Sequence, residues 1–205
     1  MKRFKAVFFD LGGVLSTGKA FELNDGVHKA VARKLKLPLD QYFDSIDTYY
    51  SDAMLGRISK REALKMMAKD LDTNSEKLER LYKQVYKKNF KRNVPLYKFA
   101  LKLKKAGYKI SIISDIWPVA KEALLDRKYS QFNDVVTSCD TGVRKINPSI
   151  FKIALKRLNI NPKEAIFTDN QKWNLPAPRK LGITAILYKN NKQFIGELKK
   201  LGIVV

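Results

Sequence analysis

Polar residues that could do chemistry follow three short apolar runs of this chain. An aspartate follows each run within two residues. Residues 6–9 are followed by Asp10, residues 109–113 by Ser114 and Asp115, and residues 165–167 by Thr168, Asp169 and Asn170. Strands often stop at polar turn residues, so one such aspartate alone would indicate little. Three together predict strand ends that converge on one polar site of an α/β enzyme. Asp10 leads into the turn Gly12-Gly13 and is the predicted nucleophile.

The remaining residue types narrow that chemistry. The chain of 205 residues has a single histidine, His28, and a single cysteine, Cys139. These two residues cannot supply an internal disulfide, a zinc cluster or a Ser-His-Asp relay. Carboxylates, hydroxyls and lysines must therefore carry any reaction.

The formal net charge of the chain is +21 at pH 7. Its basic residues decorate helical stretches instead of forming a tail, for example Lys83, Lys87, Lys88, Lys91 and Arg92, then Lys98, Lys102, Lys104, Lys105 and Lys109. Such a charge would steer phosphate-bearing molecules toward the protein. Because no known nucleic-acid reader motif accompanies it, a compositional bias is favoured over a dedicated nucleic-acid surface, although a nucleic-acid partner stays open.

No targeting or membrane segment is expected. Lys2, Arg3 and Lys5 precede apolar residues in the manner of a secretory signal, but Asp10 interrupts the apolar stretch early. No apolar run approaches the length of about 18 residues that a membrane span needs. We expect a cytoplasmic protein without membrane association.

Strand and helix patterns alternate from residue 94 onward. The predicted strands are 6–9, 109–113, 135–137, 165–168 and 183–187. Pro95, Pro118 and Pro148 suit first helical turns, and Gly107 suits a helix end. The predicted helices include 118–125, 148–158, 193–201 and one that runs to residue 181. This alternation predicts the α/β class, with a doubly wound, Rossmann-like parallel sheet.

Helical periodicity replaces this alternation after the first strand. Ser59 and Glu62 form a capping box that predicts a helix start, and Asn74 or Ser75 begins a further helix. We therefore expect a helical cap at residues 16–93, inserted into a core domain made of residues 1–15 and 94–205.

Four short segments have the order and spacing of one known family. They are Asp10-Leu11-Gly12-Gly13-Val14, Ile112-Ile113-Ser114-Asp115, Gly142-Val143-Arg144-Lys145 with Pro148, and Phe167-Thr168-Asp169-Asn170. Over nearly its whole length the chain resembles the haloacid dehalogenase-like (HAD) superfamily, in a form with a helical cap between the first two motifs. Its sugar-phosphate phosphatases and dehalogenases are the branches that it resembles.

The resemblance implies roles for individual residues. Asp10 would attack the substrate and become covalently modified, Ser114 would hydrogen-bond the transferring group, and Lys145 would keep Asp10 ionised while neutralising phosphoryl charge. The implied cofactor is Mg²⁺, and the residues predicted to hold it are Asp10, Gly12, Asp169 and Asn170. The residues predicted to bind substrate are Leu11, Gly12, Asp115 and Arg57, with Tyr49 and Tyr50 as further candidates in the cap.

Departures from the family pattern bear on activity. Gly12 stands where phosphatases of the superfamily usually carry a second Asp as general acid and base, and glycine there could hold a positive φ. Asn170 replaces one acid of the last motif, which should weaken Mg²⁺ binding because Mg²⁺ prefers charged oxygen ligands. Asp115 stands where Asn is common, and residues 146 and 147 separate Lys145 from Pro148.

The leading hypothesis is a Mg²⁺-dependent phosphatase that acts on a small phosphorylated metabolite through an aspartyl-phosphate on Asp10. Gly12 and Asn170 could reduce that activity. One alternative is a catalytically weak HAD fold that binds nucleic acid or another polyanion through its basic surface. The other is a 2-haloacid dehalogenase, which is disfavoured because no aromatic residue follows Asp10. The substrate and the oligomeric state are not predicted.

Overall fold

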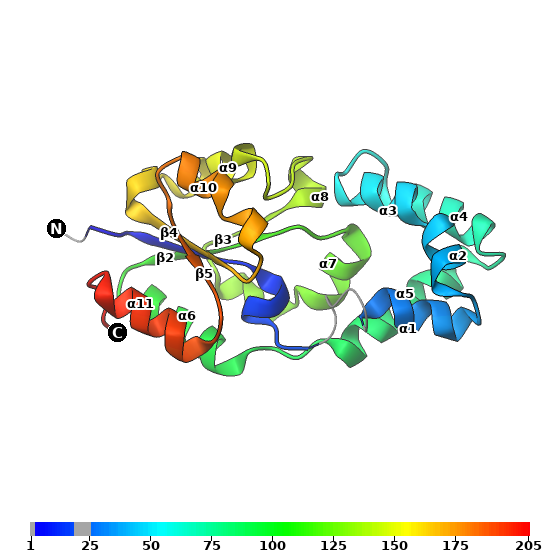
Figure 1. Ribbon diagram of the computed structural model, residues 1–205, viewed down its shortest axis with the longest axis horizontal. Helices are drawn as coiled ribbons and strands as arrows, with labels where there is room; N and C mark the ends of the chain where they lie inside the picture. Colours follow the sequence, from blue (N-terminus) through cyan, green and yellow to red (C-terminus); the bar gives the residue numbers. More distant parts are fainter. Residues whose placement is uncertain (1–2, 19–25) are drawn as a thin grey trace.

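The computed structural model describes residues 3–18 and 26–205, and it contains a sheet of five parallel strands in the order β3-β2-β1-β4-β5 (Figure 1). The strands are β1 (Ala6–Phe9), β2 (Lys109–Ser114), β3 (Asp134–Thr137), β4 (Ala165–Asp169) and β5 (Thr184–Leu187). Each pair of neighbours is parallel. All five predicted strands are confirmed, with ends that differ by at most one residue.

The register brings the three predicted strand ends together. Phe9 is the Cα partner of Ile112 on one side and of Thr168 on the other. Asp10 therefore leaves the sheet between the end of β2 and the end of β4. Because all strands are parallel, their carboxyl ends form one edge, where α/β folds place their sites.

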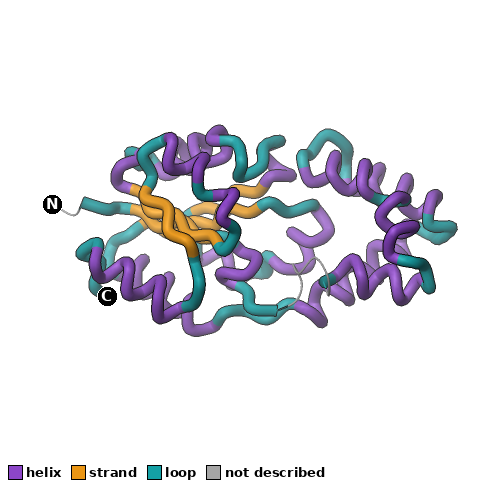
Figure 2. The backbone as a smooth tube through the Cα atoms, viewed as in Figure 1, coloured by secondary structure: helices purple, strands orange, loops and turns teal. Residues whose placement is uncertain are grey.

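Side chains alternate between the two faces of the sheet, and helices cover both faces (Figure 2). Val7, Phe9 and Ile112 pack with the helices α6 (Val94–Lys105) and α11 (Asn191–Lys200). Ala6 and Phe8 pack with α9 (Pro148–Leu158) and α10 (Pro176–Lys180) on the opposite face. The doubly wound α/β architecture is confirmed.

Of the helices that the structure describes between β1 and β2 in the chain, α1 to α5 form a separate group beyond the end of the sheet (Figure 1). They are α1 (Val27–Leu35), α2 (Leu39–Asp44), α3 (Asp47–Met54), α4 (Lys60–Asp70) and α5 (Ser75–Asn89). The capping box of Ser59 and Glu62 is confirmed, and Asn74 caps α5 with its side chain. This group is consistent with the predicted helical cap and is called the cap below, and the domain boundaries at residues 15 and 94 stay a prediction.

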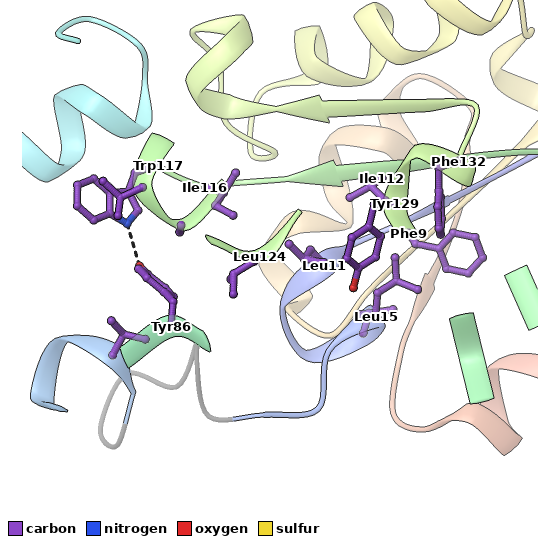
Figure 3. Packing of buried hydrophobic residues seen from close by; sticks show 14 of the residues in the cluster. Phe9, Leu11, Leu15, Tyr86, Ile112, Ile116, Trp117, Leu124, Tyr129 and Phe132 are labelled. Carbon is purple, nitrogen blue, oxygen red and sulfur yellow. Dashed lines mark hydrogen bonds between the residues drawn. The ribbon is translucent and has the colours of Figure 1, made fainter. Parts of the chain in front are cut away.

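Buried aromatic residues join the cap to the core at Trp117 (Figure 3). Trp117 immediately precedes α7 (Pro118–Leu124) and is fully buried. Its indole N–H donates to the Tyr86 hydroxyl of α5 at 2.8 Å, and its ring lies edge-on to Tyr82 at 4.9 Å between centroids. The loop that carries Asp115, directly after Ser114 at the end of β2, is therefore anchored in the cap, because it leads into this tryptophan.

The prediction of one continuous helix up to residue 181 is wrong. The segment contains a 3-10 turn, η5 (Lys172–Asn174), and then the short helix α10. Pro176 and Pro178 lack the backbone N–H groups that a continuous helix would need, and Pro176 occupies a first-turn position instead.

Further short elements are η1 (Leu11–Leu15), η3 (Arg127–Gln131), α8 (Ser138–Thr141) and η4 (Pro162–Glu164). None of the helices in the described part of the chain is long and apolar enough to cross a membrane.

The aromatic interior of the cap generates a pH prediction at His28. Its ring lies edge-on to Tyr50 at 4.7 Å, and burial lowers its pKa from 6.5 to about 4. In the unfolded chain His28 is protonated below about pH 6.5, whereas in the folded protein it stays neutral until about pH 4. The free energy of unfolding therefore decreases as the pH falls from about 6.5 toward about 4. We expect the free energy of unfolding in urea to fall by about 2 kcal/mol from this group between about pH 7 and pH 5.

His28→Asn provides the control, because it removes the only histidine of the chain. The variant should lose this part of the pH dependence. An equal loss of stability in both proteins over the same pH interval would show that His28 does not cause it.

Candidate active site

The turn after β1 fixes the backbone of the predicted nucleophile. The Asp10 N–H donates to the Thr168 carbonyl at 3.0 Å, and the Leu15 N–H donates to the Asp10 carbonyl at 3.3 Å. Gly13 has φ +79°, where glycine is favoured, whereas Gly12 has φ −75° and ψ 116°. The expectation of a positive φ at Gly12 is therefore wrong, since the tight turn places that conformation one residue later.

Lys145 forms the centre of a buried ion cluster. Its Nζ lies 2.7 Å from Oδ1 of Asp10 and 2.6 Å from Oδ2 of Asp169. The three side chains are 4%, 6% and 0% exposed, respectively. Because these side chains have almost no contact with solvent, salt screens the attraction between the Lys145 ammonium and the two carboxylates only weakly.

Burial and charge act against each other on these groups. Burial lowers the pKa of Lys145, but the carboxylates of Asp10 and Asp169 outweigh it and raise the pKa above 10.5, so the ammonium stays charged. Burial raises the pKa of Asp10 to about 7, although the Lys145 ammonium lowers it. The predicted contact between Lys145 and Asp10 is present, but Lys145 offsets the burial of Asp10 only in part.

Asp169 is held from three directions at the end of β4. Its Oδ2 accepts from Lys145 and from the Asn174 amide at 3.0 Å, and its Oδ1 accepts from the Gln171 backbone N–H at 2.7 Å. Both carboxylate oxygens are thus occupied by protein donors. This arrangement favours Asp169 as the group that positions Lys145, and its predicted role as a metal ligand stays untested.

Asn170 has a buried acceptor without a partner. Its Oδ1 makes no hydrogen bond with any described group. The side chain lies against the turn after Asp10, because a Cβ on Gly13 would collide with the Asn170 amide. An unpaired buried oxygen costs free energy unless something binds it, and a cation is one such partner. The donors Asp10, the Gly12 carbonyl and Asn170 therefore fit a hard cation such as Mg²⁺.

No cluster of three His, Cys, Asp or Glu residues suited to a metal occurs in the described residues. The predicted donor set stays a prediction, and it has only two carboxylates, Asp10 and Asp169, beside Gly12 and Asn170. The set has fewer charged oxygens than Mg²⁺ prefers.

Asp115 organises the segment that carries Lys145. Its Oδ1 accepts from the Lys145 backbone N–H at 2.9 Å, and its Oδ2 accepts from the Arg144 Nε at 3.2 Å. Asp115 thus connects the end of β2 to the segment before α9. The Asp115 carboxylate accepts both of these hydrogen bonds, and Asp115 also lines the pocket described next.

A pocket of about 210 Å³ opens at this edge of the sheet. It is lined by Asp10, Gly12, Ser114, Asp115, Arg144, Lys145, Gln171, Trp173 and Asn174. Of these, five are predicted site residues, and the structure brings them together. Sequence reasoning missed Arg144, Gln171, Trp173 and Asn174. Arg144 adjoins Lys145, and the other three follow the last motif, so their positions beside the motifs were the only available signal.

Two predicted substrate-binding residues lie elsewhere. The Leu11 side chain is fully buried in the hydrophobic core, and only the Leu11 backbone approaches Asp10. Arg57 is exposed in the cap and pairs with Asp52 at 3.1 Å. It lies outside the lining of the pocket in the described part of the chain. Tyr49 donates to Asp70 within the cap at 2.8 Å.

Known proteins are similar to this chain in sequence. A stretch covering 53% of the chain is 30% identical over 115 residues to bifunctional epoxide hydrolase 2 of Sus scrofa, and it spans only 21% of that protein. Glyceraldehyde 3-phosphate phosphatase of Pyrococcus furiosus is 27% identical over 209 residues, covering 94% of this chain and 83% of that protein.

A solved structure shows the same fold. A HAD family enzyme of Bacteroides thetaiotaomicron, in complex with magnesium and inorganic phosphate, superposes with a TM-score of 0.76 at 18% identity. The superposition covers 94% of this chain and 98% of that chain. The family profile of haloacid dehalogenase-like hydrolases matches residues 4–182. With most of its length matched to that profile, the chain belongs to the haloacid dehalogenase-like hydrolases.

Proposed function

We propose that the chain is a Mg²⁺-dependent phosphatase of small phosphorylated metabolites, with Asp10 as the nucleophile. The observation that carries this proposal is the buried cluster of Lys145, Asp10 and Asp169, of which Lys145 and Asp10 line a small pocket. Phosphoryl transfer needs an in-line nucleophile and fixed positive charge near the phosphoryl oxygens. Asp10 and Lys145 supply both.

The first step forms a bond between an Asp10 carboxylate oxygen and phosphorus, while the bond from phosphorus to the leaving oxygen breaks. The leaving oxygen departs with the bonding electrons and takes a proton from solvent or from a nearby group. In the second step water attacks the phosphorus of the aspartyl-phosphate, which regenerates the Asp10 carboxylate and releases phosphate and a proton. Lys145 neutralises phosphoryl charge, and the Ser114 hydroxyl in the pocket lining hydrogen-bonds a phosphoryl oxygen.

Mg²⁺ would be held by Asp10, the Gly12 carbonyl and Asn170. The support is the unpartnered, buried Oδ1 of Asn170 beside the turn that carries Asp10. When bound, the ion supplies positive charge that favours ionised Asp10 and offsets the charge of the phosphoryl group. The fold neighbour in complex with magnesium and phosphate is consistent with this assignment.

One of the relatives supports a phosphorylated small molecule as the substrate. The relative from Pyrococcus furiosus, which aligns with 94% of the chain, is a glyceraldehyde 3-phosphate phosphatase. The positive charge of the chain and the small volume of the pocket both suit a small phosphorylated molecule. Dehalogenation is disfavoured because it needs no metal and leaves the Asn170 oxygen without a role. Polyanion binding by the basic surface stays an untested prediction.

Asp10→Asn should reduce hydrolysis by several powers of ten, because a neutral amide cannot act as the nucleophile. Phosphate release and halide release should be measured on a panel of phosphorylated and halogenated compounds, with and without Mg²⁺. Asp140→Asn is a matched control, since that carboxylate pairs with Lys121 outside the pocket. Activity of folded Asp10→Asn within about tenfold of the wild type would contradict the mechanism.

Asn170→Asp should lower the Mg²⁺ concentration needed for half-maximal activity, because a charged oxygen replaces a neutral one. A Mg²⁺ titration of phosphate release measures this shift. An unchanged titration curve, in a variant with wild-type thermal stability, would show that Asn170 is not a ligand.

Gly12→Asp should raise the turnover of alkyl phosphates far more than that of aryl or acyl phosphates. Alkoxide leaving groups depend on a general acid that contributes roughly 10²–10⁴ in rate, and Gly12 provides none. The backbone at Gly12 accepts a side chain without strain, since its φ is −75°. Equal effects on both substrate types would show that another group already supplies the proton.

A further inference from the structure

Trp173 is an exposed aromatic side chain on the lining of the pocket. It is 62% exposed, in contrast to Trp117, which is fully buried. It lies in the 3-10 turn η5, two residues after Gln171 and directly before Asn174, the residue that holds Asp169. No aromatic ring of the described residues packs against it. An indole left in water at the edge of a site offers a flat apolar face to a ligand.

The pocket places this indole beside the predicted nucleophile. Trp173 lines the same pocket of about 210 Å³ as Asp10 and Lys145. The leaving group of a phosphate ester bound beside Asp10 and Lys145 would therefore lie within reach of the Trp173 ring.

The chemistry of the site independently restricts the leaving group. Gly12 supplies no proton to the leaving oxygen, so departure is fast only for groups that are stable as anions. Phenolates are such leaving groups, and their rings are planar. A planar ring is also what an exposed indole face binds best.

We propose that Trp173 forms a leaving-group subsite and that the substrates are aromatic phosphate monoesters, whose ring stacks on the indole. This assignment rests on the proposed phosphatase activity of Asp10. Trp173 contacts the part of the substrate that leaves, so its loss weakens substrate binding and leaves the phosphoryl chemistry intact.

The kinetic experiment compares phenyl phosphate with acetyl phosphate, which both have stable leaving anions, although only the first has a ring. Trp173→Ala should raise KM for phenyl phosphate about tenfold, with kcat within about twofold, and should change neither constant for acetyl phosphate by more than about twofold. Trp173→Phe should restore most of the binding. Ile146→Ala is the matched control, because Ile146 is 60% exposed, adjoins Lys145 and lies outside the lining.

Equal losses on both substrates, or no loss on phenyl phosphate, would overturn the subsite. A binding measurement separates this outcome from a failure of the proposed function. Phenylphosphonate, which cannot be hydrolysed, should quench the fluorescence of Trp173 in a saturable manner, whereas methylphosphonate should not. Trp117 is the only other tryptophan, so Trp173→Phe should abolish the quenching.

Quenching without phosphate release from any substrate would overturn the phosphatase activity and leave the subsite standing as a binding site. Phosphate release without quenching by phenylphosphonate would overturn the subsite alone.

Discussion

The structure of the site depends on one buried ammonium group shared by two carboxylates. Lys145 lies within 2.7 Å of both Asp10 and Asp169, and none of the three side chains is more than 6% exposed. Removing one member of such a cluster leaves uncompensated charge away from water, which typically costs 3–5 kcal/mol. The cluster therefore fixes the relative positions of the loops that it joins. It also holds a cation beside the predicted nucleophile, where phosphoryl transfer needs one.

The rest of the fold positions this cluster. The central strand β1 delivers Asp10, and the neighbouring strand β4 delivers Asp169. Asp115, at the end of β2, holds the Lys145 backbone, and Asn174 holds Asp169. The cap reaches the same region through Trp117, two residues after Asp115, which packs among the tyrosines of α5 (Figure 3). The segment from Ser114 to Trp117 thus connects the pocket to the contact between cap and core.

The predictable part of the site consists of residues whose position follows from strand ends. Asp10, Ser114 and Asp169 end apolar runs, and parallel pairing brings such ends to one edge of the sheet. Lys145 lies before a helix that begins at a proline, and only the resemblance to a family distinguished it from the other lysines.

The role of Asp115 could not be predicted, because it accepts a hydrogen bond from a backbone N–H that is distant in sequence. Trp173 was hidden because the sequence predicted a continuous helix up to residue 181, whereas Trp173 lies in the separate 3-10 turn η5. Arg57 was predicted to bind substrate, but its guanidinium pairs with Asp52, five residues earlier in the cap, and the sequence alone did not indicate that pair.

In the proposed mechanism, Asp10 carries the phosphoryl group during turnover. Protein turning over phenyl phosphate with Mg²⁺ should be quenched in acid, digested and examined by mass spectrometry, before and after borohydride reduction, which converts an aspartyl-phosphate to a stable alcohol. If Asp10 is the nucleophile, the peptide containing Asp10 should gain the mass of one phosphoryl group, and reduction should place the alcohol at Asp10. Rapid turnover with an unmodified Asp10 peptide, or with the phosphoryl group on another residue, would contradict it.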